Sequence, residues 1–314
     1  MISRTNCPVC DESSITPYIK TKAQMHFSKE FFNYDQCTNC LFVFLNPIIP
    51  PDRLKNYYTN YYLPYRGAKA WGKFEKFVER SQKKLDNKRL KLINKERKLT
   101  DSSHILDIGC GSPTFLKACK DSIGCNTTGI DFSDEGWKNY NEKFKGINLH
   151  VADIKDLEGD IYPDVITMWH YLEHDYSPSE NLRYLSSISK PSTELVIEVP
   201  NFDSVSRKKY GKYWSGWHTP RHISLFSPSN ISFLLEKTRW KAKKIYTHGT
   251  LNPYLLFWMS EMEKKGIRWD KSMEQEFKGF VIGMIKFLPK RLLERKLSLG
   301  IMTVIARPID LNSN

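Results

Sequence analysis

From residue 101 onward, short apolar runs alternate with segments in which apolar residues recur every three or four positions. The apolar runs predict strands, and the segments between them predict helices. Strands are expected at residues 103–109, 126–133, 147–153, 163–169 and 193–200, and helices at residues 113–122, 134–144 and 179–190. Because these strands are apolar along their whole length, we expect a parallel sheet that helices cover on both faces.

The pattern continues with a helix at residues 227–238, a strand at residues 240–248 and a last strand at residues 299–308. Residues 249–298, between these two strands, have mixed helical character. The fold class that we predict is therefore α/β, with a doubly wound, Rossmann-like, mostly parallel sheet of seven strands and a helical cap formed by inserts.

Two segments of different character precede this region. Residues 71–99 carry apolar side chains at helical spacing among many Lys and Arg residues, which predicts a basic connector helix. The stretch NYYTNYYLPYRG is rich in tyrosine and ends in a proline and a glycine, which mark a boundary. Its aromatic rings form either a packing seam or a roof over a ligand, and for the second case Tyr61 and Tyr65 are candidate substrate contacts.

The composition is that of a soluble globular protein. The 314 residues are 40% hydrophobic and 26% charged, and the apolar runs are too short to cross a bilayer. The first residues, MISRTNCPVC, lack the apolar stretch of a secretory signal, so we expect a cytoplasmic location. The 48 Lys and Arg residues against 35 Asp and Glu residues give a net charge of +13, which favours an anionic partner.

Four cysteines near the N-terminus form two C-x-x-C pairs, Cys7 with Cys10 and Cys37 with Cys40. Two residues between thiolates let both sulfur atoms face one ion, and a second pair completes a tetrahedral shell that suits zinc. We therefore expect a structural zinc ribbon. A redox dithiol pair or unliganded core cysteines are the alternatives.

The stretch LDIGCGSP follows the first predicted strand of the sheet. Gly109 and Gly111 allow the backbone to approach a ligand closely at the carboxyl end of that strand, where doubly wound sheets bind nucleotides. Enzymes that bind NAD use a similar loop. Asp107, however, precedes the first glycine, where its carboxylate would repel a pyrophosphate and attract an ammonium group.

Four motifs in this order, ILDIGCGSPTFL, TGIDFS, VADIKDL and PDVITMWHYLEH, resemble those of the class I S-adenosylmethionine (SAM) methyltransferases. The resemblance implies that SAM is the cofactor, that Asp131 binds the ribose hydroxyls and that Asp153 contacts the adenine. It also implies cofactor contacts for Asp107, Gly109, Gly111, Phe132, Ile154 and Trp169. The family usually has a third glycine where this chain has Pro113, which is acceptable as the first residue of a helix.

The segment after the fourth strand indicates the kind of acceptor. Methyltransferases that act on base amines commonly have Asn or Asp followed by Pro-Pro there, whereas this chain has MWHYLEH. We therefore expect an oxygen or carbon acceptor, which needs a general base. His170 is the first polar residue after the strand and is our candidate base, although a histidine that only fixes the loop is an equal alternative.

The letters HYLEH also match the H-x-x-E-H signature of one class of zinc protease. Such a protease needs both histidines on a stable helix. Here the motif follows a buried strand directly, and DYSPSE soon interrupts it, so at most one helical turn is available. We exclude the peptidase and expect His170 to be a proton acceptor.

The stretch GKYWSGWHTPRHISLFSPSNISFLLEKT resembles part of a methyltransferase subgroup often encoded in bacterial surface-polysaccharide pathways, and also of the sugar C-methyltransferases. This resemblance suggests that Arg221 binds a phosphate or carboxylate and that His222 is a second base or orienting residue. Both residues alternatively only fix the insert onto the core. His218 stands where the subgroup commonly has an acid.

The segment FKGFVIGMIKFLPKRLLERKLSLG mixes apolar and basic residues. We expect a cap helix that packs on the core, with contact to anionic lipid headgroups at the inner membrane face as the alternative. The expected parts of the chain are a zinc ribbon with a Tyr-rich linker (1–65), a basic connector helix (66–100), a SAM-binding core (101–245 with 298–308), and substrate-side inserts or a cap (203–225 and 246–297).

The sequence as a whole predicts a SAM-dependent methyltransferase that acts on an oxygen or carbon of a sugar or glycan precursor. Its net charge of +13 suggests that this small-molecule or glycan substrate is nucleotide-linked or otherwise anionic. Two alternatives stay open. One is an RNA methyltransferase, and the other is a zinc-ribbon binding protein with an inactive methyltransferase core.

Overall fold

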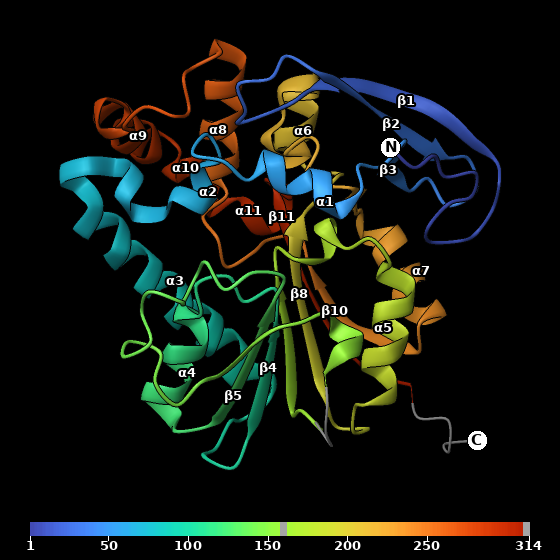
Figure 1. The fold of residues 1–314 in the computed structure, drawn as a ribbon, viewed down its shortest axis with the longest axis vertical. Coiled ribbons are helices and arrows are strands. Elements are labelled where there is room, and N and C mark those ends of the chain that lie inside the picture. Colours follow the sequence, from blue (N-terminus) through green and yellow to red (C-terminus); the bar gives the residue numbers. More distant parts are fainter. Residues whose placement is uncertain (158–161, 310–314) are drawn as a thin grey trace.

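A computed structural model of the chain describes residues 1–157 and 162–309, apart from the side chain of Tyr65 (Figure 1). Its main sheet has seven strands in the order β10-β11-β8-β7-β4-β5-β6. The strands are β4 (His104–Ile108), β5 (Asn126–Asp131), β6 (Asn148–Val151), β7 (Val165–Trp169), β8 (Glu194–Pro200), β10 (Trp240–Tyr246) and β11 (Ile301–Pro308). Strands β4 to β8 pair in parallel, and β11 is antiparallel to both of its neighbours. The predicted mostly parallel sheet is confirmed.

Helices cover both faces of this sheet, as a doubly wound fold requires. In Figure 1, α3 (Glu75–Glu96) and α4 (Thr114–Ile123) lie on one side, and α5 (Pro178–Ser187) and α7 (Pro228–Lys237) lie on the other. Pro178 and Pro228 each occupy the first helical position, where the missing amide hydrogen costs nothing. Ser227 and Asn230 form a capping box that fixes the start of α7.

The helix predicted at residues 134–144 is wrong, because the structure has turns there. Gly136 explains the difference. A side chain at this position would meet the Gly111 carbonyl oxygen at 2.2 Å, so this segment presses directly against the loop after β4. Trp137 and Phe144 are buried beneath it. A close backbone approach has therefore replaced the regular helix that the apolar spacing predicted.

The N-terminal residues form a second sheet of four strands in the order β1-β2-β3-β9. Three strands, β1 (Ile15–Lys22), β2 (Phe31–Cys37) and β3 (Val43–Leu45), come from the segment predicted as a ribbon. The fourth, β9 (Ser224–Leu225), comes from the insert that follows β8 and pairs antiparallel with β3. The ribbon sheet therefore contains a strand from a distant part of the chain.

The remaining helices lie with the ribbon at one end of the main sheet (Figure 1). They are α1 (Pro51–Leu54), α2 (Leu63–Arg66), α6 (Val205–Tyr210), α8 (Tyr254–Lys265), α9 (Glu274–Lys286), α10 (Leu288–Leu292) and α11 (Glu294–Leu297). Six 3-10 helices are also described: η1 (Lys55–Tyr57), η2 (Gly67–Phe74), η3 (Ile154–Asp156), η4 (Leu172–His174), η5 (Gly211–Tyr213) and η6 (Ser215–Trp217).

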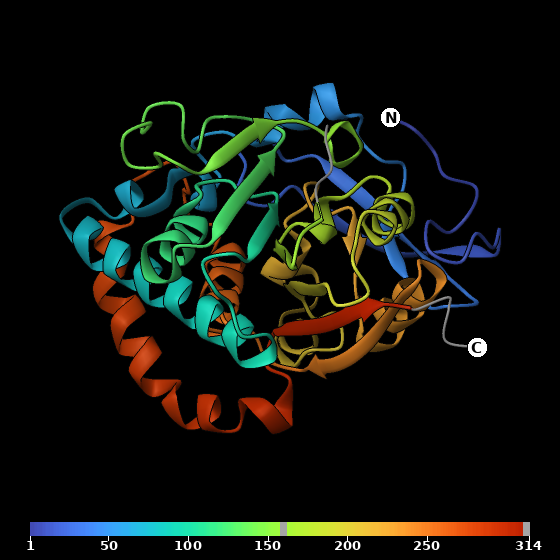
Figure 2. The same ribbon diagram turned by 90° about the horizontal axis from the view of Figure 1, so that it is seen from below.

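Helices α9 to α11 form an arc at the edge of the molecule (Figure 2). This arc packs on η2 through aromatic rings, with Phe74 and Phe277 stacked at 3.7 Å between centroids. Its outer side exposes apolar side chains, including Ile285 at 58% and Leu292 at 86%. Among the described residues, no helix is both long enough and apolar enough to span a bilayer.

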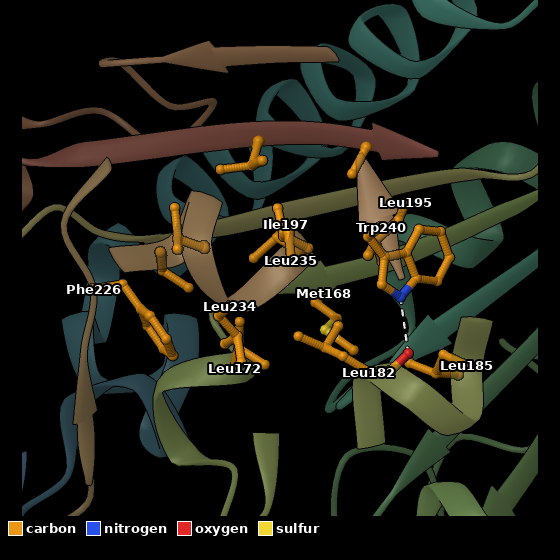
Figure 3. Packing of buried hydrophobic residues seen from close by; sticks show 14 of the residues in the cluster. Met168, Leu172, Leu182, Leu185, Leu195, Ile197, Phe226, Leu234, Leu235 and Trp240 are labelled. Carbon is orange, nitrogen blue, oxygen red and sulfur yellow. Dashed lines mark hydrogen bonds between the residues drawn. The ribbon is translucent and has the colours of Figure 1, made fainter. Parts of the chain in front are cut away.

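The apolar core between the sheet and helices α5 and α7 is shown in Figure 3. Met168 and Ile197 project from the sheet, and Leu182 and Leu234 meet them from the two helices. The indole of Trp240 closes this core, and its Nε1 donates to the Leu182 carbonyl at 2.8 Å. This bond satisfies the one polar atom that the indole brings into the core.

We expect Leu234→Ala to lower the free energy of unfolding by about 2–5 kcal/mol, because it removes buried methyl groups and leaves a cavity. Leu234 is 0% exposed, whereas its neighbour Phe233 is 42% exposed and supplies the control. Phe233→Ala should change the free energy by no more than about 0.5 kcal/mol. Urea unfolding measures both variants, and equal losses would contradict the packing described.

Candidate functional site

The loop after β4 wraps tightly around the end of the neighbouring strand. The amides of Gly109 and Cys110 both donate to the Ile130 carbonyl, at 2.8 and 3.0 Å. Gly109 and Gly111 have φ values of 70° and 48°, a region that favours glycine. A side chain at Gly109 would lie 2.3 Å from the Tyr171 ring, while the space at Gly111 is open. The loop is thus an open cradle bordered by Tyr171.

Two carboxylates lie beside this cradle. Asp107 is 3% exposed and accepts a hydrogen bond from the Thr167 hydroxyl at 2.5 Å. Burial raises the pKa of Asp107 to about 7, although the Thr167 hydroxyl and the charge of Arg89 favour the ionised form. Asp131 accepts from the amides of Gly111 at 2.9 Å and Ser133 at 3.2 Å. Burial also raises the pKa of Asp131.

The other residues expected to contact the cofactor extend from this point. Phe132 follows β5 and is 70% exposed, and its ring lies 5.6 Å from that of Tyr58. Asp153 caps η3 through a 3.5 Å bond from the Lys155 amide, and Ile154 is buried behind it. Since β5 and β6 are parallel neighbours, these residues lie along the same sheet edge as the cradle.

Trp169, the last residue of β7, is buried and contacts a residue that the sequence reasoning missed. The guanidinium of Arg89 lies 4.6 Å from the centre of the Trp169 ring. Arg89 is 9% exposed and belongs to α3, predicted as a basic connector. It is therefore not part of a solvated basic face. Among many similar basic residues, no signal in the sequence distinguished it.

His170 lies at the start of the loop after β7, with a φ of 58°. Its Nδ1 is 3.4 Å from Oε1 of Glu173, and its Nε2 is 3.3 Å from Oε1 of Glu198. Burial disfavours the charged ring, but the two carboxylates outweigh it and raise the pKa of His170 to about 9. The raised pKa favours the imidazolium at neutral pH, whereas the sequence suggested a free base.

Glu198 is the second functional residue that the sequence reasoning missed. It lies in β8, is 0% exposed, and accepts from the Thr250 amide at 2.5 Å and the Thr303 hydroxyl at 3.1 Å. Burial opposes its charge, but His170, the charge of Arg89 and the Thr250 amide lower the pKa of Glu198 to about 2. An acid in the middle of the strand ELVIEVP, with apolar residues on both sides, was the signal that could have identified it.

Three more histidines surround the loop after β7. His174, His218 and His222 are in ring contact, with centroids 4.6 Å apart for His174 and His222 and 4.5 Å apart for His218 and His222. His222 is 3% exposed, and its Nδ1 lies 2.8 Å from the Gly216 carbonyl oxygen. Burial lowers the pKa of all three rings, so they are neutral.

The guanidinium of Arg221 is fully buried beneath this group. Its Nη1 donates to the Tyr57 carbonyl and its Nη2 to the Gln24 carbonyl, both at 2.7 Å. Its carbon Cζ lies 4.1 Å from the centre of the Tyr62 ring. Both terminal nitrogens therefore bind backbone of the linker and the ribbon, and neither points to solvent.

The tyrosines nearest this group differ from those chosen from the sequence. Tyr58 places its hydroxyl 3.3 Å from Nδ1 of His174, and Tyr62 lies under Arg221. Tyr61 instead contacts Phe27 at the outer surface, with ring centroids 5.9 Å apart. The side chain of Tyr65 lies outside the described part of the chain.

The four N-terminal cysteines converge, with all four sulfur atoms within 4.8 Å of one another. Cys7 and Cys40 are 3.6 Å apart between Sγ atoms, and Cys10 and Cys37 are 3.4 Å apart. Four thiolates at about 2.3 Å from one ion have separations of this size, so the residues fit tetrahedral zinc.

A family model described as a methyltransferase domain matches residues 77–242. A chain from the complex that contains the Haloferax volcanii Trm112 methyltransferase activator has a TM-score of 0.50 and 14% identity, covering 78% of this chain and 100% of that one. An Archaeoglobus fulgidus SAM-dependent methyltransferase has a TM-score of 0.46 and 21% identity, covering 71% and 94%. The [4+2]-cyclase SpnF has a TM-score of 0.49 and 16% identity, covering 71% and 82%. No curated protein matches. At 14% identity, the first structure shows a shared fold alone.

We expect Arg221→Met to lower the free energy of unfolding by about 2–6 kcal/mol, because two buried carbonyls lose their donors. Arg183→Met, at an exposed position of α5, is the matched control and should have little effect. Chemical denaturation followed by tryptophan fluorescence measures both. A wild-type value for Arg221→Met would show that the buried guanidinium does not hold the ribbon and linker in place.

Proposed function

The chain belongs to the methyltransferase domain family, and on this premise we propose that it transfers a methyl group from SAM to an oxygen or carbon of a sugar or glycan precursor. The observation that carries the proposal is the direct contact between the glycine cradle and the loop that bears His170, through Tyr171 at Gly109. A cofactor cradle and a group that can move a proton therefore share one edge of the sheet. Methylation of oxygen or carbon requires both.

In this proposal, Gly109 and Gly111 hold the cofactor with their backbone, Asp107 faces its ammonium group and Asp131 faces its ribose. The adenine contacts Phe132, Asp153 and Ile154. Trp169 lies below the cofactor, and the guanidinium of Arg89 packs on its ring. The open space at Gly111 and the buried carboxylates beside it fit SAM. When bound, SAM supplies an electrophilic methyl group.

For the proton of the acceptor, we propose the group formed by His170, Glu173 and Glu198 instead of the imidazole alone. As the ring takes the acceptor's proton at one nitrogen, it passes the proton of its other nitrogen to the carboxylate that this nitrogen faces, so the ring keeps its charge. The two carboxylates hold the ring in place at 3.4 and 3.3 Å and balance its charge. The ring is 25% exposed, whereas both acids are buried. Arg221 fixes the insert that carries His222, and we assign it no direct contact with the acceptor.

An anionic glycan as the acceptor is supported by the cap. A cavity of about 300 Å³ lies among α6, α8, α9 and α10. It is lined by aromatic rings, by the three cations Lys209, Lys265 and Lys290, and by the two carboxylates of Glu261 and Glu276, so cations outnumber acids by one. Aromatic rings can bind the faces of a sugar, and lysines beside them can bind a phosphate. Such a lining suits a nucleotide-linked or phosphorylated sugar. We propose a role in cell-surface polysaccharide synthesis, with zinc in the four-cysteine cluster as a structural ion.

The net charge of +13 also favours RNA as an acceptor. An RNA substrate would bind with a steep dependence on salt and would be displaced by unrelated polyanions. A sugar nucleotide carries only a few charges and would show a shallow dependence. The salt dependence of acceptor binding therefore separates the two substrate classes.

We expect the affinity for SAM to fall as the pH drops below about 7, by up to about tenfold per pH unit. Burial raises the pKa of Asp107 to about 7, and only its ionised form attracts an ammonium group. Binding therefore requires loss of a proton below that pH and none above it. Calorimetry at several pH values measures the effect.

Asp107→Asn is the control for this pH dependence. It should bind SAM weakly at every pH, and any pH dependence that it keeps comes from other groups, such as Asp131. If the variant kept both the wild-type affinity and the wild-type pH dependence, Asp107 would not contact the cofactor. Failure of zinc-loaded wild-type protein to bind SAM at any pH would refute the proposed function.

We expect His170→Gln to lower kcat by about 10²-fold or more while the affinity for SAM stays unchanged. Glutamine keeps a polar side chain but cannot carry a proton between the acceptor and the two carboxylates. The assay uses SAM labelled in its methyl group with a panel of nucleotide sugars, envelope glycans and RNA. His150→Gln, at an exposed position of β6, is the matched control. An unchanged kcat in His170→Gln would remove His170 from the chemistry.

A further inference from the structure

The side chains of Glu173, His174 and His222 converge beside His170. The proposed methyl transfer does not explain why all three lie together. Glu173 and His174 belong to η4, and His222 belongs to the insert after β8. One ligand atom from each lies within 4.8 Å of the others. Oε1 of Glu173 is 4.0 Å from Nε2 of His222. A carboxylate oxygen and two imidazoles therefore face a common point.

The Glu173 carboxylate lacks the partners that a buried charge requires. Its side chain is 1% exposed, and neither oxygen accepts a hydrogen bond from any residue that the structure describes. The 3.4 Å contact with His170 is an ion pair without the geometry of a hydrogen bond. A buried carboxylate in this state is strongly disfavoured unless another group compensates its charge. Its oxygens are free to bind a cation.

The two histidines are oriented as metal ligands usually are. Nδ1 of His174 lies 3.0 Å from the Arg221 carbonyl oxygen, and Nδ1 of His222 lies 2.8 Å from the Gly216 carbonyl oxygen. A carbonyl only accepts, so Nδ1 donates a hydrogen in both rings and Nε2 is the nitrogen available to a metal ion; in His222 this nitrogen faces Oε1 of Glu173. Metal-binding histidines are typically held by such a bond from the other ring nitrogen.

We propose that Glu173, His174 and His222 bind a divalent first-row transition metal ion. Two imidazoles and one carboxylate suit zinc, manganese or iron, whereas magnesium and calcium prefer an all-oxygen shell. Ligand atoms at about 2.1 Å from an ion lie about 3.4 Å apart in tetrahedral geometry. The three side chains therefore close by about 1 Å around the ion, a movement within the reach of side-chain rotation.

This site is separate from the four-cysteine cluster, because the two sets share no residue. It also differs from the protease motif H-x-x-E-H, whose two histidines bind one ion from a single helix. Here only Glu173 and His174 of that motif contribute, and the third ligand, His222, comes from the later insert. His170 instead lies between two carboxylates.

The role of the ion rests on the proposed function. Because the site adjoins His170, a bound ion would attract the acceptor's oxygen and make its hydroxyl easier to deprotonate. The ion binding itself is independent of SAM and of the acceptor. Failure of the metal site and failure of the methyltransferase function can therefore be observed separately.

The test counts the zinc ions that remain on the full chain after saturation and gel filtration. We expect two per wild-type chain, one per chain in Glu173→Gln and in His222→Ala, and one in the double variant Cys7→Ser, Cys10→Ser. His150→Ala, which alters an exposed histidine away from the cluster, should keep two. Retention of the second ion in both Glu173→Gln and His222→Ala would overturn the site.

A second measurement needs no variant. Wild-type protein with zinc only in the cysteine cluster is titrated with Co²⁺, which should give visible d–d absorption without the thiolate charge-transfer band of a cysteine site. Absence of this absorption, with one zinc per chain at saturation, would also overturn the proposal. If SAM still bound in calorimetry, the proposed function would stand without the metal; if Co²⁺ bound but SAM did not, the metal site would stand alone.

Discussion

The positions of the ribbon, the Tyr-rich linker and the insert after β8 depend on the buried guanidinium of Arg221. Its two terminal nitrogens donate to the carbonyls of Gln24 and Tyr57, both at 2.7 Å, and its flat face lies on Tyr62. One side chain of the insert thereby holds the ribbon and the Tyr-rich linker against the methyltransferase core. A lysine has no planar fork and would satisfy at most part of this set, so the geometry is specific to arginine.

This attachment also builds the site. Because the insert is held over the loop after β7, the amide of Ile223 donates to the Glu173 carbonyl at 2.9 Å, and Ser224 and Leu225 pair with the ribbon sheet. The same short segment thus brings His218 and His222 to the loop that bears His170. The ribbon, linker and insert act as one structural layer over the carboxyl edge of the parallel strands, where doubly wound sheets bind their ligands.

Elements with strong local patterns were predictable from the sequence, and contacts between distant segments were not. The apolar strands and the glycine loop were recognisable because their periodicity and their residue types are set locally. The helix expected at residues 134–144 failed because Gly136 presses against Gly111, a contact that no local pattern encodes. Strand β9 and Arg89 were missed for the same reason: each is defined by a partner far away in the sequence. Tyr58 and Tyr62 likewise lie beside the site through contacts with His174 and Arg221, which are far away in the sequence.

The motif HYLEH shows that the chemistry of a sequence motif depends on the structure around it. Excluding a helical protease motif was sound, since η4 spans only Leu172–His174. That exclusion does not extend to every metal site, because a ligand set is defined by convergence in space and not by spacing along one helix. A fold that buries the Glu173 and Glu198 carboxylates among four histidines carries a large desolvation cost. Glu198 offsets its share through four donors and His170, whereas Glu173 has only an ion pair. A cation bound to Glu173 would compensate the charge that its neighbours leave uncompensated.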